Sequence, residues 1–270
     1  MRMLHFFCHG FAVFVTAASI FAQSNETTPP SGKDFKSILI VPAKETKPWS
    51  INFAPYGWVT AVDGKITLRG ITSHVHESAI DTLKSLQGAF MAVAEIRYKR
   101  WGVLGDFIYA KTSSDSSTPR GVLFSSTTAD LEEFIGTFAL EYRPLEAKWG
   151  FMDVLAGARV YAFTTSLHLQ GHLLPDLNIT RHVSWVDPII GMKGRISFSH
   201  WFFINAYGDV GGFDAGSEFT WQALLGSGFQ VSRWCALIAG YRALGYNFWQ
   251  NDTNLNLISH GPYAGIEITF

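Results

Sequence analysis

The sequence predicts an all-β fold, an antiparallel transmembrane β-barrel of about ten strands. Three observations predict it: a composition poor in charge and rich in aromatic residues, tryptophans that recur along the chain, and strand-like runs in which apolar and polar residues alternate. The chain has 270 residues, of which 47% are apolar, 15% aromatic and only 16% charged. Because water-soluble proteins carry about 25% charged residues, this composition favours a protein that faces lipid.

The composition also excludes several classes of protein. Beyond the first two dozen residues, no apolar run approaches the roughly 20 residues that a membrane-spanning helix needs. The aromatic content argues against a disordered chain, and the formal charge of -1 argues against a nucleic-acid-binding protein. A β-rich protein remains.

The N-terminal segment has the features of an export signal. Arg2 is followed by an apolar run and then by small residues, so Met1–Ala22 is predicted to be a cleaved signal peptide. Residues 23–48 are polar and contain several prolines, and we expect a flexible periplasmic segment there. The barrel is then predicted to occupy residues 49–270. Cys235 is the only cysteine left after cleavage, which excludes an intramolecular disulfide.

Five tryptophans divide the predicted barrel into hairpins. Each opens a strand-like run, which is followed by a looser polar stretch and a returning run, so five hairpins give ten strands. The connections that hold the tryptophans are short and the others are mostly longer, which is typical of outer-membrane barrels with short periplasmic turns and long extracellular loops. Indole rings prefer the membrane interface. We therefore expect a periplasmic girdle formed by Trp49, Trp101, Trp149, Trp201 and Trp234.

The strand number has two alternatives. The stretch Lys65–Val75 can extend the first hairpin or form a pair of its own, so eight or twelve strands are also compatible with the sequence.

Alternation within the runs separates two faces. In Phe90–Lys99, for example, one face is apolar and the other holds Glu95, Arg97 and Lys99. A basic residue on the lipid face costs roughly 2–4 kcal/mol at midplane, so the charged face must line the lumen. The predicted lumen charges are Glu95, Arg97, Asp106, Glu141, Arg143, Asp153, Arg159, Asp187, Lys193, Arg195, Asp209, Arg242 and Glu267.

The near balance of seven acids and six bases suggests a lumen that is largely filled. A ten-stranded barrel has a narrow interior, and buried charges are usually paired. We therefore expect a structural or surface-interaction barrel that is not an enzyme. A narrow porin-like channel for small solutes is the alternative, and an enzyme at the barrel rim is a distant third.

Short motifs carry a resemblance to a known family. The runs Ala54-Pro55-Tyr56-Gly57-Trp58, Glu95–Gly102 and Gly240-Tyr241-Arg242 resemble those of an uncharacterised family of Gram-negative outer-membrane β-barrels. The terminal Phe270 resembles the end of the last strand that the outer-membrane assembly machinery recognises. The resemblance implies a barrel fold, a location in the outer membrane, and lipids and the assembly machinery as partners; it implies no activity, and any extracellular ligand of the loops stays open.

Candidate chemistry at the rim is sparse. We predict neither a cofactor nor a catalytic residue, because no adjacent Asp-Asp or Asp-His occurs there, as the rim chemistry of ten-stranded omptin proteases would require. Ser78–Leu86 is predicted to form a short helix, either a lid on the mouth or a surface excursion. A metal site is not expected. The only candidate ligands are loop histidines, namely His74, His76, His168, His172 and His182.

Overall fold

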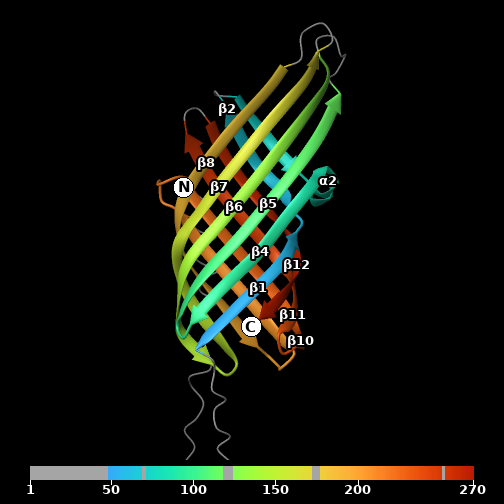
Figure 1. The fold of residues 1–270 in the computed structure, drawn as a ribbon. Helices are drawn as coiled ribbons and strands as arrows, with labels where there is room; N and C mark the ends of the chain where they lie inside the picture. The colour runs from blue at the N-terminus through green and yellow to red at the C-terminus, as the bar shows by residue number, and fades with distance from the viewer. Residues whose placement is uncertain (1–47, 69–70, 118–123, 172–176, 251–252) are drawn as a thin grey trace, which may run out of the picture. The chain divides into compact units, whose positions relative to one another are not determined.

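The computed structural model describes residues 48–68, 71–117, 124–171, 177–250 and 253–270 (Figure 1). The predicted signal peptide and all but the last residue of the predicted segment 23–48 lie outside the described residues. No helix in the described ranges is long and apolar enough to cross a membrane.

The described chain consists almost entirely of strands. In chain order the elements are β1 Trp49–Trp58, β2 Ala61–Leu68, β3 Ile71–Glu77, α2 Ala79–Ser85, β4 Leu86–Tyr98, β5 Trp101–Ser117, β6 Phe124–Ala147, β7 Gly150–Gly171, β8 Leu177–Ser197, β9 Phe202–Gly212, β10 Phe219–Ser232, β11 Cys235–Gln250 and β12 Thr253–Thr269.

Ten of these strands close into an antiparallel barrel. The order runs β1-β4-β5-β6-β7-β8-β9-β10-β11-β12, and β12 pairs back with β1, for example Phe53 with Ile268. Closure leaves no open sheet edge where the ten strands pair, which a lipid environment requires. The predicted ten-stranded barrel is therefore confirmed.

Two further strands form an extra hairpin on this barrel. After β1 the chain continues along the same edge of β12 as β2, from Ala61 opposite His260 to Leu68 opposite Thr253, and β3 folds back on β2. Of the alternatives left open for Lys65–Val75, the structure thus has the separate strand pair.

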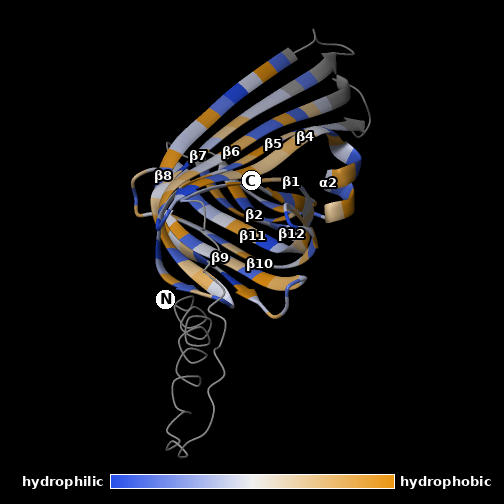
Figure 2. Ribbon diagram, turned by 60° about the horizontal axis from the view of Figure 1, so that its bottom comes forward, coloured by the Kyte–Doolittle hydropathy of each residue, from blue (hydrophilic) through white to orange (hydrophobic). Residues whose placement is uncertain are grey.

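Alternation places apolar side chains outside and polar ones inside. Neighbouring residues on β4 show the contrast, since Ile96 is 50% exposed and Arg97 only 4%. Figure 2 shows hydrophobic and hydrophilic residues alternating along the strands. An outer surface of this kind is unfavourable in water and suits hydrocarbon.

The two ends of the barrel differ in their connections. Short connections join β4 to β5, β6 to β7, β8 to β9 and β10 to β11, and β1 begins and β12 ends at the same side. Lys99 takes a left-handed conformation (φ 52°) in the first of these turns, and its backbone N–H donates to Pro48 O at 2.8 Å. Each of the five predicted girdle tryptophans lies at this end with at least half of its surface exposed.

At the opposite end the strands are longer than the sequence predicts. The sequence predicts long loops here, at about residues 113–128 and 166–178, but most of both stretches is strand. β6, β7 and β8 have 24, 22 and 21 residues, and with β5 they rise above the other strands in Figure 1. In their upper parts the outward residues are polar, so these parts lack the apolar outer face by which a membrane strand is recognised. Polar pairs such as Thr164 with His182 and Ser166 with Thr180 join β7 to β8 there.

The predicted short helix is present as α2. Ser78 caps it, because its hydroxyl accepts a hydrogen bond from Asp81 N, and no residue of the helix is buried. The helix lies outside the ring of strands near β4 (Figures 1 and 2). It is therefore a surface excursion, and the alternative of a lid on the mouth is wrong.

Candidate functional site

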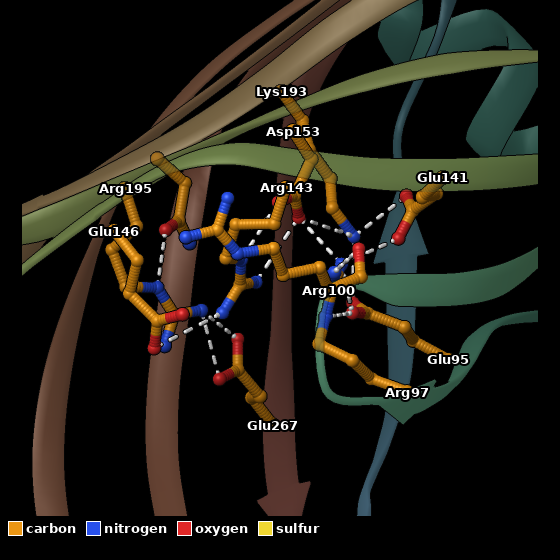
Figure 3. Close-up of polar contacts among 11 residues, drawn as sticks. Glu95, Arg97, Arg100, Glu141, Arg143, Glu146, Asp153, Lys193, Arg195 and Glu267 are labelled. Atoms are coloured by element: carbon orange, nitrogen blue, oxygen red, sulfur yellow. Dashed lines mark hydrogen bonds and ion pairs between the residues drawn. The ribbon is translucent and has the colours of Figure 1, made fainter.

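The charged side chains that alternation assigns to the lumen meet one another inside the barrel (Figure 3). The most connected is Arg97 on β4. Its Nη2 donates to Glu141 Oε2 on β6 at 2.8 Å and to Asp153 Oδ2 on β7 at 2.5 Å, and its Nε donates to Glu95 Oε1 at 2.9 Å. One guanidinium thus connects three carboxylates.

Two further cations complete this network. Lys193 Nζ on β8 lies 2.6 Å from Glu95 Oε2 and 2.8 Å from Glu141 Oε1. Arg143 Nε lies 2.7 Å from Asp153 Oδ1. Three acids and three bases therefore neutralise one another, which low-dielectric surroundings demand of buried ions. We call Glu95, Arg97, Glu141, Arg143, Asp153 and Lys193 the lower charge layer.

A separate ion pair lies nearer the short-turn end. Arg195 Nη2 on β8 donates to both carboxylate oxygens of Glu267 on β12, at 2.8 and 2.6 Å. Its Nε donates to Asn205 Oδ1 at 2.8 Å, and its guanidinium stacks 4.1 Å from the Phe203 ring centre. Arg195 is thus fixed by contacts with three residues, and its ion pair with Glu267 crosses the lumen at the short-turn end.

A third set of charges lies above the lower charge layer. Arg242 on β11 donates from Nη2 to Asp106 Oδ2 on β5 at 2.7 Å and to Gln222 Oε1 on β10 at 2.8 Å. The Tyr56 hydroxyl on β1 accepts from Arg242 Nη1 at 2.6 Å and donates to Asp106 Oδ1 at 2.7 Å. Tyr56 entered the sequence analysis only as part of a motif; its lumen-facing position in the alternation of β1 could have indicated this role.

Arg159 and Asp209 form a fully buried pair in the same part of the lumen. Arg159 Nη2 lies 2.5 Å from Asp209 Oδ2, and both side chains have no solvent exposure. Thr137 accepts from Arg159 Nε at 3.0 Å, and the Tyr207 hydroxyl donates to Asp209 Oδ2 at 2.6 Å. We call Tyr56, Asp106, Arg159, Asp209, Gln222 and Arg242 the upper charge layer.

Asp187 is the predicted lumen charge with no basic partner among the described ion pairs. It instead accepts from the backbone N–H of Ser217 at 2.6 Å, from its hydroxyl at 2.7 Å and from Trp185 Nε1 at 3.1 Å. Ser217 lies in the short connection between β9 and β10 and is completely buried. Asp187 therefore holds that connection against the inside of the wall, an interaction that the sequence analysis did not predict.

An aromatic cluster fills the lumen next to Asp187. The Trp185 ring stacks on Tyr161 with centroids 4.6 Å apart and on Phe248 at 4.1 Å, and Tyr246 lies 5.2 Å from Tyr161. These four residues come from β7, β8 and β11 and are all less than one-tenth exposed. Their close packing leaves the lumen apolar and filled at this level.

The four candidate histidines that the structure describes do not come together as a metal site. Among the described residues, the one group with metal-ligand spacing is Glu95, Glu141 and Asp153, and Arg97 and Lys193 already bind these carboxylates. His74 and His76 lie on β3, and His168 and His182 lie on β7 and β8. His172 lies outside the described residues.

At the rim, Asp63 contacts two histidines that are distant from it in the sequence, so a search for adjacent Asp-His residues did not reveal them. Pairing of β2 with β3 and β12 places Asp63 between two histidines: Asp63 Oδ1 lies 2.5 Å from His76 Nδ1, and Asp63 Oδ2 lies 2.9 Å from His260 Nε2. The Tyr241 hydroxyl meets His260 Nδ1 at 2.5 Å. Because Arg242 faces the lumen, its neighbour Tyr241 faces outward. The registers of β12, β2 and β3 place His260, Asp63 and His76 on the same outer surface of the barrel. Hydrogen bonds with His260 and His76 lower the pKa of Asp63, and the Asp63 carboxylate raises the pKa of His76.

Comparison with known proteins supports the architecture. No protein-family model and no curated protein sequence matches the chain. The outer membrane protease OmpT from Escherichia coli is similar in structure, with a TM-score of 0.52 and 10% sequence identity over 84% of this chain and 99% of OmpT. The fold is that of an outer-membrane β-barrel. At this identity the likeness concerns the fold and carries no activity.

Two other solved barrels are similar at lower TM-scores. The translocator domain of the autotransporter NalP from Neisseria meningitidis is 11% identical, with a TM-score of 0.47 over 82% of this chain and 89% of that domain. Ail, the attachment invasion locus protein of Yersinia pestis, is 13% identical, with a TM-score of 0.35 over 83% of this chain and all of Ail. The likeness to OmpT confirms, at the level of the fold, the expected resemblance to Gram-negative outer-membrane barrels.

Proposed function

We propose that this protein is an integral barrel of the Gram-negative outer membrane whose lumen is sealed, and that it acts through its surface as a structural or interaction protein. The observation that carries the proposal is the set of ion pairs that cross the lumen. Lys193 on β8 reaches Glu95 on β4, Arg242 on β11 reaches Asp106 on β5, and Arg195 on β8 reaches Glu267 on β12. In each case three strands lie between the partners along the shorter way around the barrel.

These contacts differ from pairs between adjacent strands. A bond between neighbours lies along the wall and leaves the centre free, whereas a bond between strands on different sides runs through the centre. A solute passing through would have to separate partners buried in a low-dielectric interior, and leaving one such charge unpaired costs about 3–5 kcal/mol. The aromatic cluster adds an apolar barrier above the charges.

The tall wall formed by β5–β8 supports the surface role. Its upper strands carry paired polar side chains on their outward face, as in the contact of His168 with Asn178 at 2.8 Å. Long paired strands present a fixed surface, which a flexible loop does not. This wall is the part of the barrel best suited to contact a partner outside the cell.

Conductance of the refolded protein in a planar bilayer tests the sealed lumen. We expect no discrete current steps from the wild-type chain. A variant in which Arg97, Arg143 and Lys193 are all changed to Ala should conduct or fail to fold, and a shift in gel mobility on boiling separates these outcomes. Discrete channels from the wild-type protein would overturn the proposal and favour the narrow porin-like channel.

We also propose that the protein is not an enzyme. The Asp63–His76 contact lies on the outside of the wall, and the His76 side chain is 82% exposed, so it encloses no substrate. Incubation of the refolded barrel with a mixture of peptides tests this. Cleavage that disappears in Asp63→Asn, while the barrel remains folded, would overturn the proposal.

A further inference from the structure

The barrel wall is interrupted between β1 and β4. Their pairing runs from Trp49–Tyr98 to Pro55–Ala92 and stops there. Above this point Tyr56–Trp58 pair only with β12, and Leu86–Met91 pair only with β5. After β1 the chain continues along β12 as β2 and returns to β4 through β3 and α2, so no strand pairs with the upper part of β4 on this side. The two strand edges therefore diverge in the upper part of the wall.

A groove of about 220 Å³ occupies this interruption. Its lining comes from β1, from the residues after it, from α2 and from β4: Tyr56, Gly57, Trp58, Val59, Thr82, Leu83 and Met91 are among them. Alternation makes Tyr56, Trp58 and Met91 face the lumen and Gly57 face outward, so the groove extends through the thickness of the wall. An apolar cavity of about 150 Å³ is known to hold benzene, so this groove has room for part of a hydrocarbon chain.

Three of the polar side chains that line the groove already have partners within the protein. The Tyr56 hydroxyl donates to Asp106 at 2.7 Å, Trp58 Nε1 donates to Gly261 O at 3.2 Å, and Thr82 Oγ1 donates to Ser78 O at 3.3 Å. These three side chains therefore offer no free donor to a polar ligand. The lining thus favours an apolar occupant over water or a polar solute.

The groove lies at the height of the outer leaflet. Pro55 follows Trp49 by six residues and Thr60 by eleven, which at about 3.3 Å per residue and a tilt of roughly 40° places them roughly 15 and 28 Å above the tryptophan girdle. The apolar band of such barrels is about 25 Å tall. The groove therefore opens where the acyl chains and headgroups of the outer leaflet meet.

Helix α2 extends the apolar surface beside the groove. Ile80 is 65% exposed and Leu83 is 54% exposed, and Leu83 also lines the groove. Exposed apolar side chains on a short helix at the membrane interface are stabilised by contact with lipid. The medium next to this opening is therefore hydrocarbon.

We propose that the groove between β1, β4 and α2 binds one acyl chain of an outer-leaflet lipid, whose headgroup stays at the membrane surface beside α2. The inference rests on the proposed membrane placement and not on the sealed lumen. A lipid held in the wall would complete the seam that the strands leave open. It makes the protein a specific binder of membrane lipid.

Two glycines provide a matched test. A Cβ built on Gly57 or on Gly88 meets nothing within 4 Å, so both positions accept a larger side chain. Gly57 lines the groove, whereas Gly88 lies on β4 outside its lining. Gly57→Phe therefore fills the groove, and Gly88→Phe adds the same side chain nearby without filling it.

Lipid retention is the measurement. The full-length mature barrel is refolded in micelles with dioleoyl phosphatidylethanolamine, washed with detergent and analysed by native mass spectrometry, with the gel shift on boiling as the folding check. Wild type and Gly88→Phe should each retain one lipid per barrel, and Gly57→Phe should retain at least fivefold less. Absence of retained lipid in the wild type, or equal retention in Gly57→Phe, would overturn the inference. Channel activity in a bilayer would instead contradict only the sealed lumen.

Discussion

Arg97 Nη2 lies 2.5 Å from Asp153 Oδ2, and this contact joins β4 to β7, which are separated in the sheet by β5 and β6. The contact therefore spans a chord of the barrel and does not follow its wall. Asp153 also accepts from Arg143, so one buried carboxylate contacts two guanidinium groups. Its position makes it the acid on which the lower charge layer most depends.

Replacing Asp153 should strongly destabilise the barrel. Asp153→Ala removes the one buried carboxylate that Arg143 contacts among the described ion pairs and one of the three that Arg97 contacts. We expect a loss of about 3–5 kcal/mol in the free energy of unfolding. Urea titration in micelles, followed by tryptophan fluorescence, measures it. The control is Glu146→Ala, because the Glu146 side chain is 64% exposed and 3.9 Å from Arg143, and it should change stability by less than about 0.5 kcal/mol. Similar losses in the two variants would contradict the prediction.

Removing the Asp187 carboxylate should release the connection between β9 and β10. Asp187→Ala removes three hydrogen bonds, two of them to Ser217, and we expect cleavage by a protease in residues 213–218 to become about tenfold faster. Ser217→Ala keeps the backbone N–H bond at 2.6 Å and should give an intermediate rate. Mass spectrometry of the fragments locates the cut. Equal rates in all three proteins would show that Asp187 does not hold this segment.

The Asp63–His76 contact should make the β2–β3 hairpin sensitive to pH. Asp63 raises the pKa of His76 above 6.5, so the stabilisation is full below that value and is lost as the pH rises through the raised pKa. His260 and His76 lower the pKa of Asp63 below 3.8, so the stabilisation is also lost as the pH falls through that lowered pKa. We expect the hairpin to be most protected between these limits.

Amide hydrogen exchange in β2 and β3, corrected for the intrinsic dependence on pH, measures this protection. It should weaken as the pH rises from about 6 to 9 in the wild type, whereas His76→Gln should show a flatter profile over the same range. A wild-type profile as flat as that of the variant would refute the link between His76 and the hairpin.

The last residue should govern assembly more than stability. Phe270 is exposed, and its backbone N–H donates to Ile51 O at 2.9 Å, a bond that any side chain at this position permits. Phe270→Ala should therefore reduce the amount of folded barrel in the outer membrane several-fold, while the purified variant unfolds within about 1 kcal/mol of the wild type. Quantifying folded protein in membrane fractions by the gel shift provides the test. Normal assembly would remove the proposed role of Phe270.

Much of the lumen follows from the period-two pattern of the chain. Because side chains on a strand alternate between two faces, the position of Ile96 outside requires Arg97 inside, and the same rule orients Asp153, Arg159 and Arg242. Four of the tryptophans likewise mark the short turns, since the chain reverses next to Trp101, Trp149, Trp201 and Trp234. These features depend only on local geometry.

The alternating pattern predicted the structure less well in the parts of the strands that extend beyond the apolar band. In the upper parts of β6–β8 the outward residues are polar, so the sequence predicts loops where hydrogen bonds between backbones continue the sheet. Asp63 and His76 belong to β2 and β3, whose pairing with each other and with β12 brings them together although neither neighbours the other in the chain.

The sequence by itself determined the barrel, its charged interior and its apolar exterior, because the requirement to hide polar groups from hydrocarbon acts on each residue separately. Only the tertiary structure decided which charges meet. Arg97 and Asp153 are 56 residues apart, and their contact depends on the curvature and register of a closed sheet. The same closure opens the seam between β1 and β4, because one edge of β12 pairs first with β1 and then with β2.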